Sequence, residues 1–101
     1  MNATKTISQR VVQTSLQVVN DFNVALSDPM VAKLPACIKK MSEKANACLL
    51  DVQKKAQENL CSSDPEPWDA NFVKEWPSKV RAYKSICLLL SQQCKRLSNH
   101  A

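Results

Sequence analysis

The sequence lacks glycine altogether over its 101 residues. Glycine supplies the positive backbone φ of tight hairpin turns and the close backbone approach that phosphate-binding loops need. Its absence therefore argues against β-sandwiches and barrels, and the chain contains neither a P-loop nor a dinucleotide-binding fingerprint. An enzyme that binds nucleotides through such loops is excluded.

Long hydrophobic runs are also missing. The longest, residues 86–90, is far shorter than the roughly 20 apolar residues of a membrane-spanning helix. The first residues show no apolar segment typical of a secretory signal. We therefore expect a cytoplasmic or nuclear protein, with secretion or the mitochondrial intermembrane space as the alternative.

Residues for catalysis or metal binding are scarce. The single histidine, His100, stands next to the end of the sequence, and no two cysteines form a C-x-x-C pair. A zinc site needs several such ligands, and a cysteine nucleophile needs a neighbouring base. We expect no enzymatic activity, no metal, no cofactor and no small-molecule substrate.

What the sequence does contain is helical periodicity. Apolar residues recur at intervals of three and four, and the hydrophobic fraction of 45% suits a globular chain. This pattern predicts an all-α fold in which three main helices form a helical bundle or an antiparallel coiled coil. The helices are expected at about residues 6–26, 35–61 and 69–98, within one domain that spans residues 1–101.

Helix ends are marked by local signals. Thr6 and Gln9 have the spacing of a capping box, and Asp28 precedes a proline that suits the first position of a helix. Two prolines in residues 61–68 predict a hinge before the last helix, where Ser63 and Glu66 are candidate caps. Pro77 is expected either to kink the last helix or to restart it.

Each long helix has a candidate buried face. In the second helix this face is formed by Leu34, Ile38, Met41, Ala45, Cys48, Val52, Ala56 and Leu60. The last helix shows an average repeat of 3.5 residues, which is typical of a coiled-coil seam. The residues that we single out as its interaction seam are Trp76, Val80, Tyr83, Ile86, Leu89, Leu90 and Leu97.

Positive charge gathers in the last helix. The whole chain carries a net charge of +5, and residues 78–101 hold five basic groups and no acidic one. The basic flank consists of Lys79, Arg81, Lys84, Lys95 and Arg96. Such residues suit a solvated helix face or an acidic protein surface, and they leave an anionic membrane surface open as a partner. Without interleaved aromatic residues they do not favour nucleic-acid binding.

The five cysteines fit either free thiols or a stapled hairpin. If the second and third helices are antiparallel, Cys48 and Cys87 form a candidate disulfide. Two cysteine pairs on a helical hairpin resemble the twin-cysteine proteins of the mitochondrial intermembrane space. The spacings depart from that family, since ten and six residues separate the cysteines here, where the family has equal spacings.

These observations favour a non-enzymatic interaction subunit or adaptor that joins other helical chains, as a hetero- or homo-oligomer, through its apolar seams. We expect that replacing Leu90 with aspartate abolishes such assembly. The alternative is a secreted, disulfide-stapled helical effector or carrier of a lipid-like ligand. A third hypothesis is a basic amphipathic protein that acts on membrane surfaces through its last helix.

Overall fold

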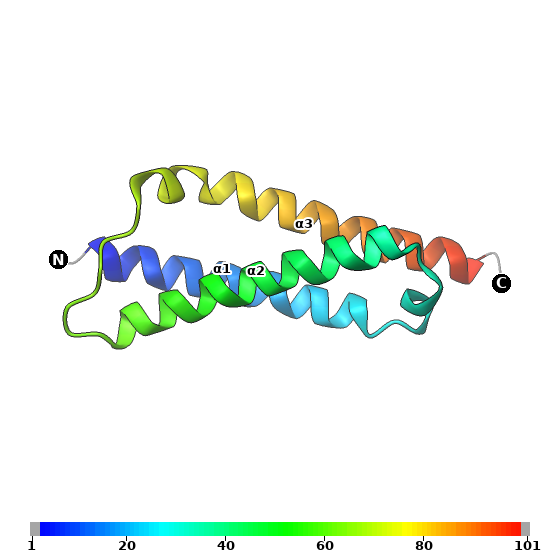
Figure 1. Ribbon diagram of the computed structural model, residues 1–101, viewed down its shortest axis with the longest axis horizontal. Coiled ribbons are helices and arrows are strands. Elements are labelled where there is room, and N and C mark those ends of the chain that lie inside the picture. The colour runs from blue at the N-terminus through cyan, green and yellow to red at the C-terminus, as the bar shows by residue number, and fades with distance from the viewer. Residues whose placement is uncertain (1–2, 100–101) are drawn as a thin grey trace.

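The computed structural model describes residues 3–99, and over that range the chain is helical with no strand. The elements are α1 (Ala3–Leu26), the short 3-10 helix η1 (Pro29–Lys33), α2 (Ala36–Cys61) and α3 (Ala70–Asn99). α2 runs antiparallel to α1, and α3 returns antiparallel to α2 (Figure 1). The predicted fold class, a bundle of three main helices, is confirmed.

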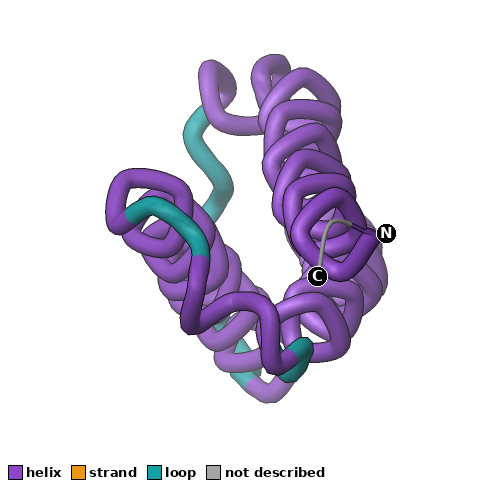
Figure 2. Tube along the Cα trace, turned by 90° about the vertical axis from the view of Figure 1, so that its right-hand side faces the viewer, coloured by secondary structure: helices purple, strands orange, loops and turns teal. Residues whose placement is uncertain are grey.

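The bundle is elongated. Its principal extents are 55 × 22 × 18 Å and its radius of gyration is 15.9 Å, compared with about 13 Å for a compact domain of 100 residues. Seen along the long axis, the helices lie side by side (Figure 2), and the connecting loops lie at the two ends of the bundle (Figure 1). The length of the helices therefore sets the length of the molecule.

The core is built from one heptad-spaced face on each helix. The buried residues are Ser8, Val11, Ser15, Val18, Val19, Phe22 and Ala25 on α1; Ser42, Ala45, Leu49 and Ala56 on α2; and Trp76, Val80, Cys87, Leu90 and Cys94 on α3. α1 and α2 make the most extensive contact of any two helices, while α3 makes less with either. Serine and alanine on the facing sides of α1 and α2 suit such close packing.

One predicted helix cap is confirmed and two are wrong. The Asp28 carboxylate accepts a hydrogen bond from the backbone N–H of Met30 at 2.9 Å, with Pro29 in the first position of η1. The capping box fails because α1 begins at Ala3, which places Thr6 and Gln9 inside the helix.

At the start of α3 the cap is Asp69, whose carboxylate accepts from the backbone N–H of Asn71 at 2.9 Å. Ser63 and Glu66, the expected caps, lie several residues before the helix begins at Ala70. Pro77 lies within α3, which continues through it to Asn99, so the proline does not restart the helix. Pro77 and Val73, whose carbonyl loses its helical donor, are both exposed.

On α1 and α2, the face that is buried differs from the face that carries the most apolar residues. On α2, Met41 is 38% exposed and Cys48 is exposed, whereas Ser42 and Leu49 are fully buried. On α1, Leu16 is 45% exposed while Ser15 is fully buried. Because the Ser15 hydroxyl donates to the Val11 carbonyl at 2.6 Å, it enters the core with its hydrogen bond satisfied.

Candidate functional site

Two observations on the described residues bear on possible chemistry. Residues 3–99 contain no group of three histidine, cysteine or acidic side chains that could hold a metal ion. Burial raises the pKa of the Cys87 thiol, and the Asp21 carboxylate raises it further, so this thiol stays protonated and is a poor nucleophile. His100 lies outside the described residues. The expectation that the chain is not an enzyme stays a prediction.

The predicted interaction seam of α3 lies against the other two helices. Trp76, Val80 and Leu90 are buried, and the partly buried seam residues are Tyr83, Ile86, Leu89 and Leu97. This stripe therefore contributes to the core of its own chain. Surfaces available to a partner lie on the two sides of α3, where open grooves separate it from α2 and from α1.

We call the first of these the α2/α3 groove. It has a volume of about 210 Å³ and is lined by Met41, Lys44, Ala45, Cys48, Tyr83 and Ile86. Burial raises the pKa of the Tyr83 phenol, and the nearby Cys48 thiol adds to this effect. Apart from the lysine, the lining side chains are apolar or weakly polar, which suits an apolar occupant.

An aromatic row runs from the segment before α3 into its first turns, and Phe72 and Trp76 of this row line a hollow between α1 and α3. The rings of Trp68 and Phe72 stack with centroids 4.9 Å apart, and those of Phe72 and Trp76 stack at 5.4 Å. Lys55 of α2 places its ammonium 5.3 Å from the centroid of Trp68, and Lys79 lies 5.6 Å from that of Phe72. Each contact has cation–π geometry.

The row is anchored to α1 by a single long-range hydrogen bond. The indole N–H of Trp68 donates to the Ser8 hydroxyl at 2.9 Å, and that hydroxyl donates to the Thr4 carbonyl at 2.7 Å. By contrast, the indole nitrogen of Trp76 is buried without a hydrogen-bond partner. Ser8 thus fixes the segment that leads into α3.

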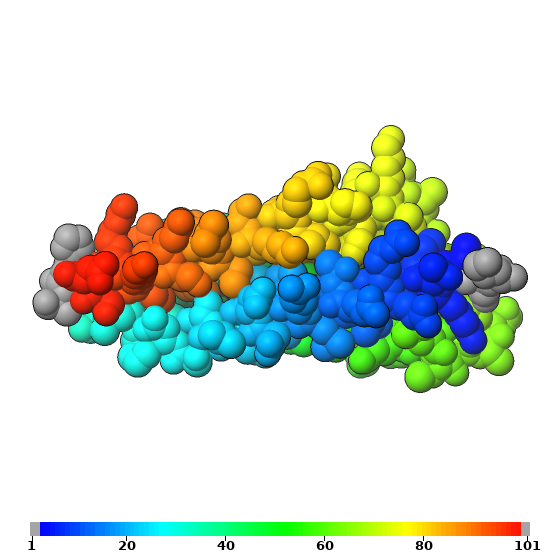
Figure 3. All heavy atoms as spheres, turned by 180° about the vertical axis from the view of Figure 1, so that it is seen from behind, coloured from blue at the N-terminus to red at the C-terminus, as the bar shows by residue number. Residues whose placement is uncertain are grey.

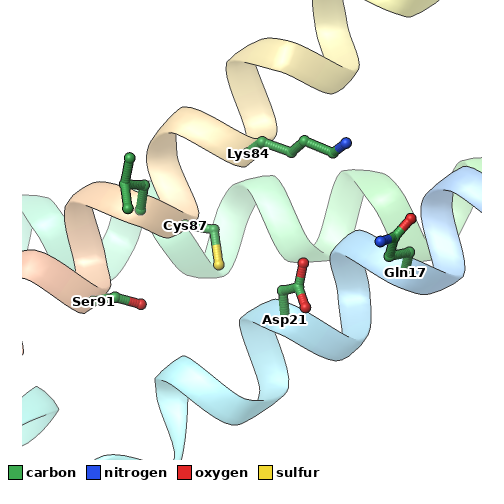
Figure 4. A pocket seen from close by; sticks show the side chains of 6 residues that line it. Gln17, Asp21, Lys84, Cys87 and Ser91 are labelled. Carbon is green, nitrogen blue, oxygen red and sulfur yellow. The ribbon is translucent and has the colours of Figure 1, made fainter.

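On its other side, α3 borders the α1/α3 groove. α1 and α3 run side by side along the face shown in Figure 3. The largest hollow between them, about 380 Å³, is lined by Gln17, Asp21, Lys84, Cys87, Leu88 and Ser91. Gln17 and Asp21 point from α1 toward α3 (Figure 4). A second hollow, of about 260 Å³, is lined by Arg10, Thr14, Trp76, Pro77 and Val80.

The predicted basic flank does not form one surface. Lys79 covers the Phe72 ring, whereas Lys84 lines the α1/α3 groove. Arg81 donates to the Ser78 hydroxyl at 3.1 Å, and Lys95 and Arg96 are exposed near the end of α3. The structure therefore distributes the cations over different sides of α3.

The candidate disulfide is not formed in this structure. All five cysteines are free thiols, with Cys87 and Cys94 buried and the other three exposed. Cys48 lines the α2/α3 groove and Cys87 lines the α1/α3 groove. These two side chains therefore face different sides of the bundle.

Sequence reasoning missed the α2 side of the first groove, since it assigned Met41 and Cys48 to the core. The heptad through Ser42, Ala45 and Leu49 would have placed both beside the buried face. It also left out the aromatic row, although Trp68, Phe72 and Trp76 recur every four residues in the sequence.

Comparison of the chain with models of protein families, with curated proteins and with solved structures gave no match. Among the described residues, no helix has the length and hydropathy of a bilayer-spanning segment. The fold and the grooves define the chain as an elongated bundle of three helices in up–down–up order.

Proposed function

We propose that this chain is a non-enzymatic interaction module that binds helical partner chains through the open sides of α3. The observation that carries the proposal is the placement of exposed apolar side chains. Among residues 3–99, six large hydrophobic residues are exposed: Leu16, Val24, Met41, Leu50, Val73 and Leu88. Three of them line hollows beside α3. Met41 lines the α2/α3 groove, Leu88 lines the α1/α3 groove, and Val73 lines a further hollow between α1 and α3.

The elongated shape supports the same function. A groove between two long helices suits a helix better than a compact small molecule, because an amphipathic helix lays an apolar stripe along such a surface. Membrane binding through α3 is less well supported, since an interfacial helix needs a free apolar face opposite its basic residues. The apolar face of α3 is buried, and its cations lie on different sides.

The proposal is tested by two aspartate variants of α2. Met41 lines the α2/α3 groove and is 38% exposed, whereas Leu50 is 47% exposed and does not line it. Because both side chains are exposed, we expect Met41→Asp and Leu50→Asp to fold with nearly unchanged stability. In quantitative native co-purification, Met41→Asp should lose the helical partner and Leu50→Asp should retain it.

Leu88→Asp applies the same test to the α1/α3 groove. If all three variants recover the same proteins in the same amounts as the wild type, neither groove binds a partner and the proposal is wrong. Equal loss in all three would point to general surface hydrophobicity and would also contradict it.

A further inference from the structure

Of the two grooves, the one between α2 and α3 is better suited to an apolar segment. The α1/α3 groove contains the polar side chains of Gln17, Asp21 and Ser91 along its largest hollow. The α2/α3 groove has one charged residue, Lys44, among its six lining residues. An occupant of this groove therefore needs an apolar stripe.

The charged residues beside this groove indicate which residues should flank the apolar stripe of its occupant. Lys44 lines the groove itself, Lys55 follows Cys48 by about two turns of α2, and Lys79 precedes Tyr83 by about one turn of α3. Lys44 and Lys55 belong to α2 and Lys79 to α3, so cations stand on both sides. Together, α2 and α3 contain eleven basic residues and four acidic ones. This imbalance favours a partner with acidic residues on both edges of its apolar face.

The geometry points to an acidic amphipathic helix as the occupant of the α2/α3 groove, and this inference rests on the proposed function. Its apolar residues would contact Met41, Cys48, Tyr83 and Ile86, and its carboxylates would meet Lys44, Lys55 and Lys79. Residues 70–86 of α3 span about 24 Å at 1.5 Å per residue, so a helix of about four to five turns matches this length.

A second copy of this chain is a poorer occupant on electrostatic grounds. The net charge is +5, and α2 and α3 hold most of the cations, so two copies that meet at this surface would repel each other. A free helix with glutamates on both flanks supplies the charge that the groove lacks.

The exposed thiols of α2 provide a direct readout. Cys48 lies in the groove, whereas Cys37 and Cys61 are exposed on the same helix but do not line it. The probe is a fluorescein-labelled 18-residue helical peptide with leucine at heptad spacing and glutamate on both flanks. Its binding is measured by anisotropy, and alkylation of each thiol is followed by peptide mass spectrometry.

We expect the acidic peptide to bind, to slow the alkylation of Cys48 but not of Cys37 or Cys61, and to weaken as salt rises. Lys44→Glu and Lys79→Glu should each weaken binding by about tenfold. Lys95→Glu makes the same change of charge near the end of α3 and should leave binding close to that of the wild type.

Three results would overturn the inference. A matched peptide with lysine in place of glutamate could bind as tightly, a scrambled acidic peptide could protect Cys48 equally, or anionic vesicles could protect Cys48 where the peptide does not. If these occur while Met41→Asp still loses its native partner, the interaction function stands and only the acidic helix is wrong. If Met41→Asp, Leu50→Asp and Leu88→Asp all retain the same partners, the proposed function itself fails.

Discussion

The buried face of α3 and the two sides of that face differ in what they contact. Along the buried face of α3, Val80, Leu90 and Cys94 are at most 7% exposed and belong to the hydrophobic core. Beside it, Leu88 is 58% exposed and Tyr83 borders an open groove. A heptad repeat predicts burial against helices, but it does not tell whether those helices belong to the same chain. Here the buried face stabilises the fold, and its two sides are the surfaces that we propose for partners.

The comparison is tested most strongly by two leucines on the same helix. Leu90 is fully buried and Leu88 is mostly exposed. Leu90→Ala removes core contacts and leaves a cavity, so we expect it to lower the free energy of unfolding by about 2–5 kcal/mol. Leu88→Ala should change it by no more than about 0.5 kcal/mol. Urea denaturation followed by circular dichroism measures both, and equal effects would contradict the assignment of seam and side.

The same burial changes the expected outcome of Leu90→Asp. From the sequence, this variant was expected to abolish assembly with other chains. Because Leu90 is fully buried within its own bundle, an aspartate there would place a charge in the core and unfold the chain. Variants of exposed groove residues are therefore the informative tests of assembly.

The fold followed from the sequence, but the faces of two helices did not. Helix number, the Asp28 cap and the α3 heptad were all predicted correctly from periodicity and proline placement. The buried faces of α1 and α2 include serines such as Ser15 and Ser42, which a hydrophobicity pattern assigns to the surface.

The grooves could not be predicted for a related reason. They depend on how far α3 stands from each neighbour, and this distance is set by the packing of all three helices together. The sequence gives the residues on each side of α3, such as Tyr83 and Leu88, but periodicity alone does not say which of them meet a side chain of another helix.

A second comparison concerns two buried serines of α1. Ser8 contacts the segment before α3, whereas Ser15 hydrogen-bonds within its own helix. Ser8→Ala removes the acceptor of the Trp68 indole N–H, and we expect a loss of about 1–3 kcal/mol because a part-buried donor is left unpaired. Ser15→Ala is the matched control. Its hydroxyl bonds only to carbonyls of its own helix, so its loss should be nearly neutral, since alanine favours helix.

Thermal unfolding and the fluorescence of the tryptophans would report both changes. A Ser8→Ala protein as stable as Ser15→Ala would show that the Trp68 hydrogen bond does not hold the segment before α3 in place.

The smallest effect concerns the two buried thiols of α3, Cys87 and Cys94, at alkaline pH. Burial raises the pKa of Cys87 and Cys94 above the usual thiol value of 9.0, with added contributions from Asp21 and Asp28 respectively. Above that pH the unfolded chain loses these protons while the native chain keeps them. The native state then binds more protons, so stability must fall as pH rises. This contribution is complete below pH 9.0 and is lost as pH rises through the folded pKa values.

The measurement is the slope of unfolding free energy against pH between about 8 and 10, taken from urea titrations. Replacing Cys87 and Cys94 together with alanine should lower stability at every pH through lost packing, but it should flatten that slope. Cys48→Ala, which changes an exposed thiol in the α2/α3 groove, should leave the slope as steep as in the wild type. The Tyr83 phenol, whose usual pKa is 10.0 and is also raised by burial, is present in every variant, so its contribution near pH 10 cancels in the comparison. An unchanged slope in the double variant would mean that the seam thiols are as accessible to solvent as those beside the seam, which would remove the distinction between the two regions.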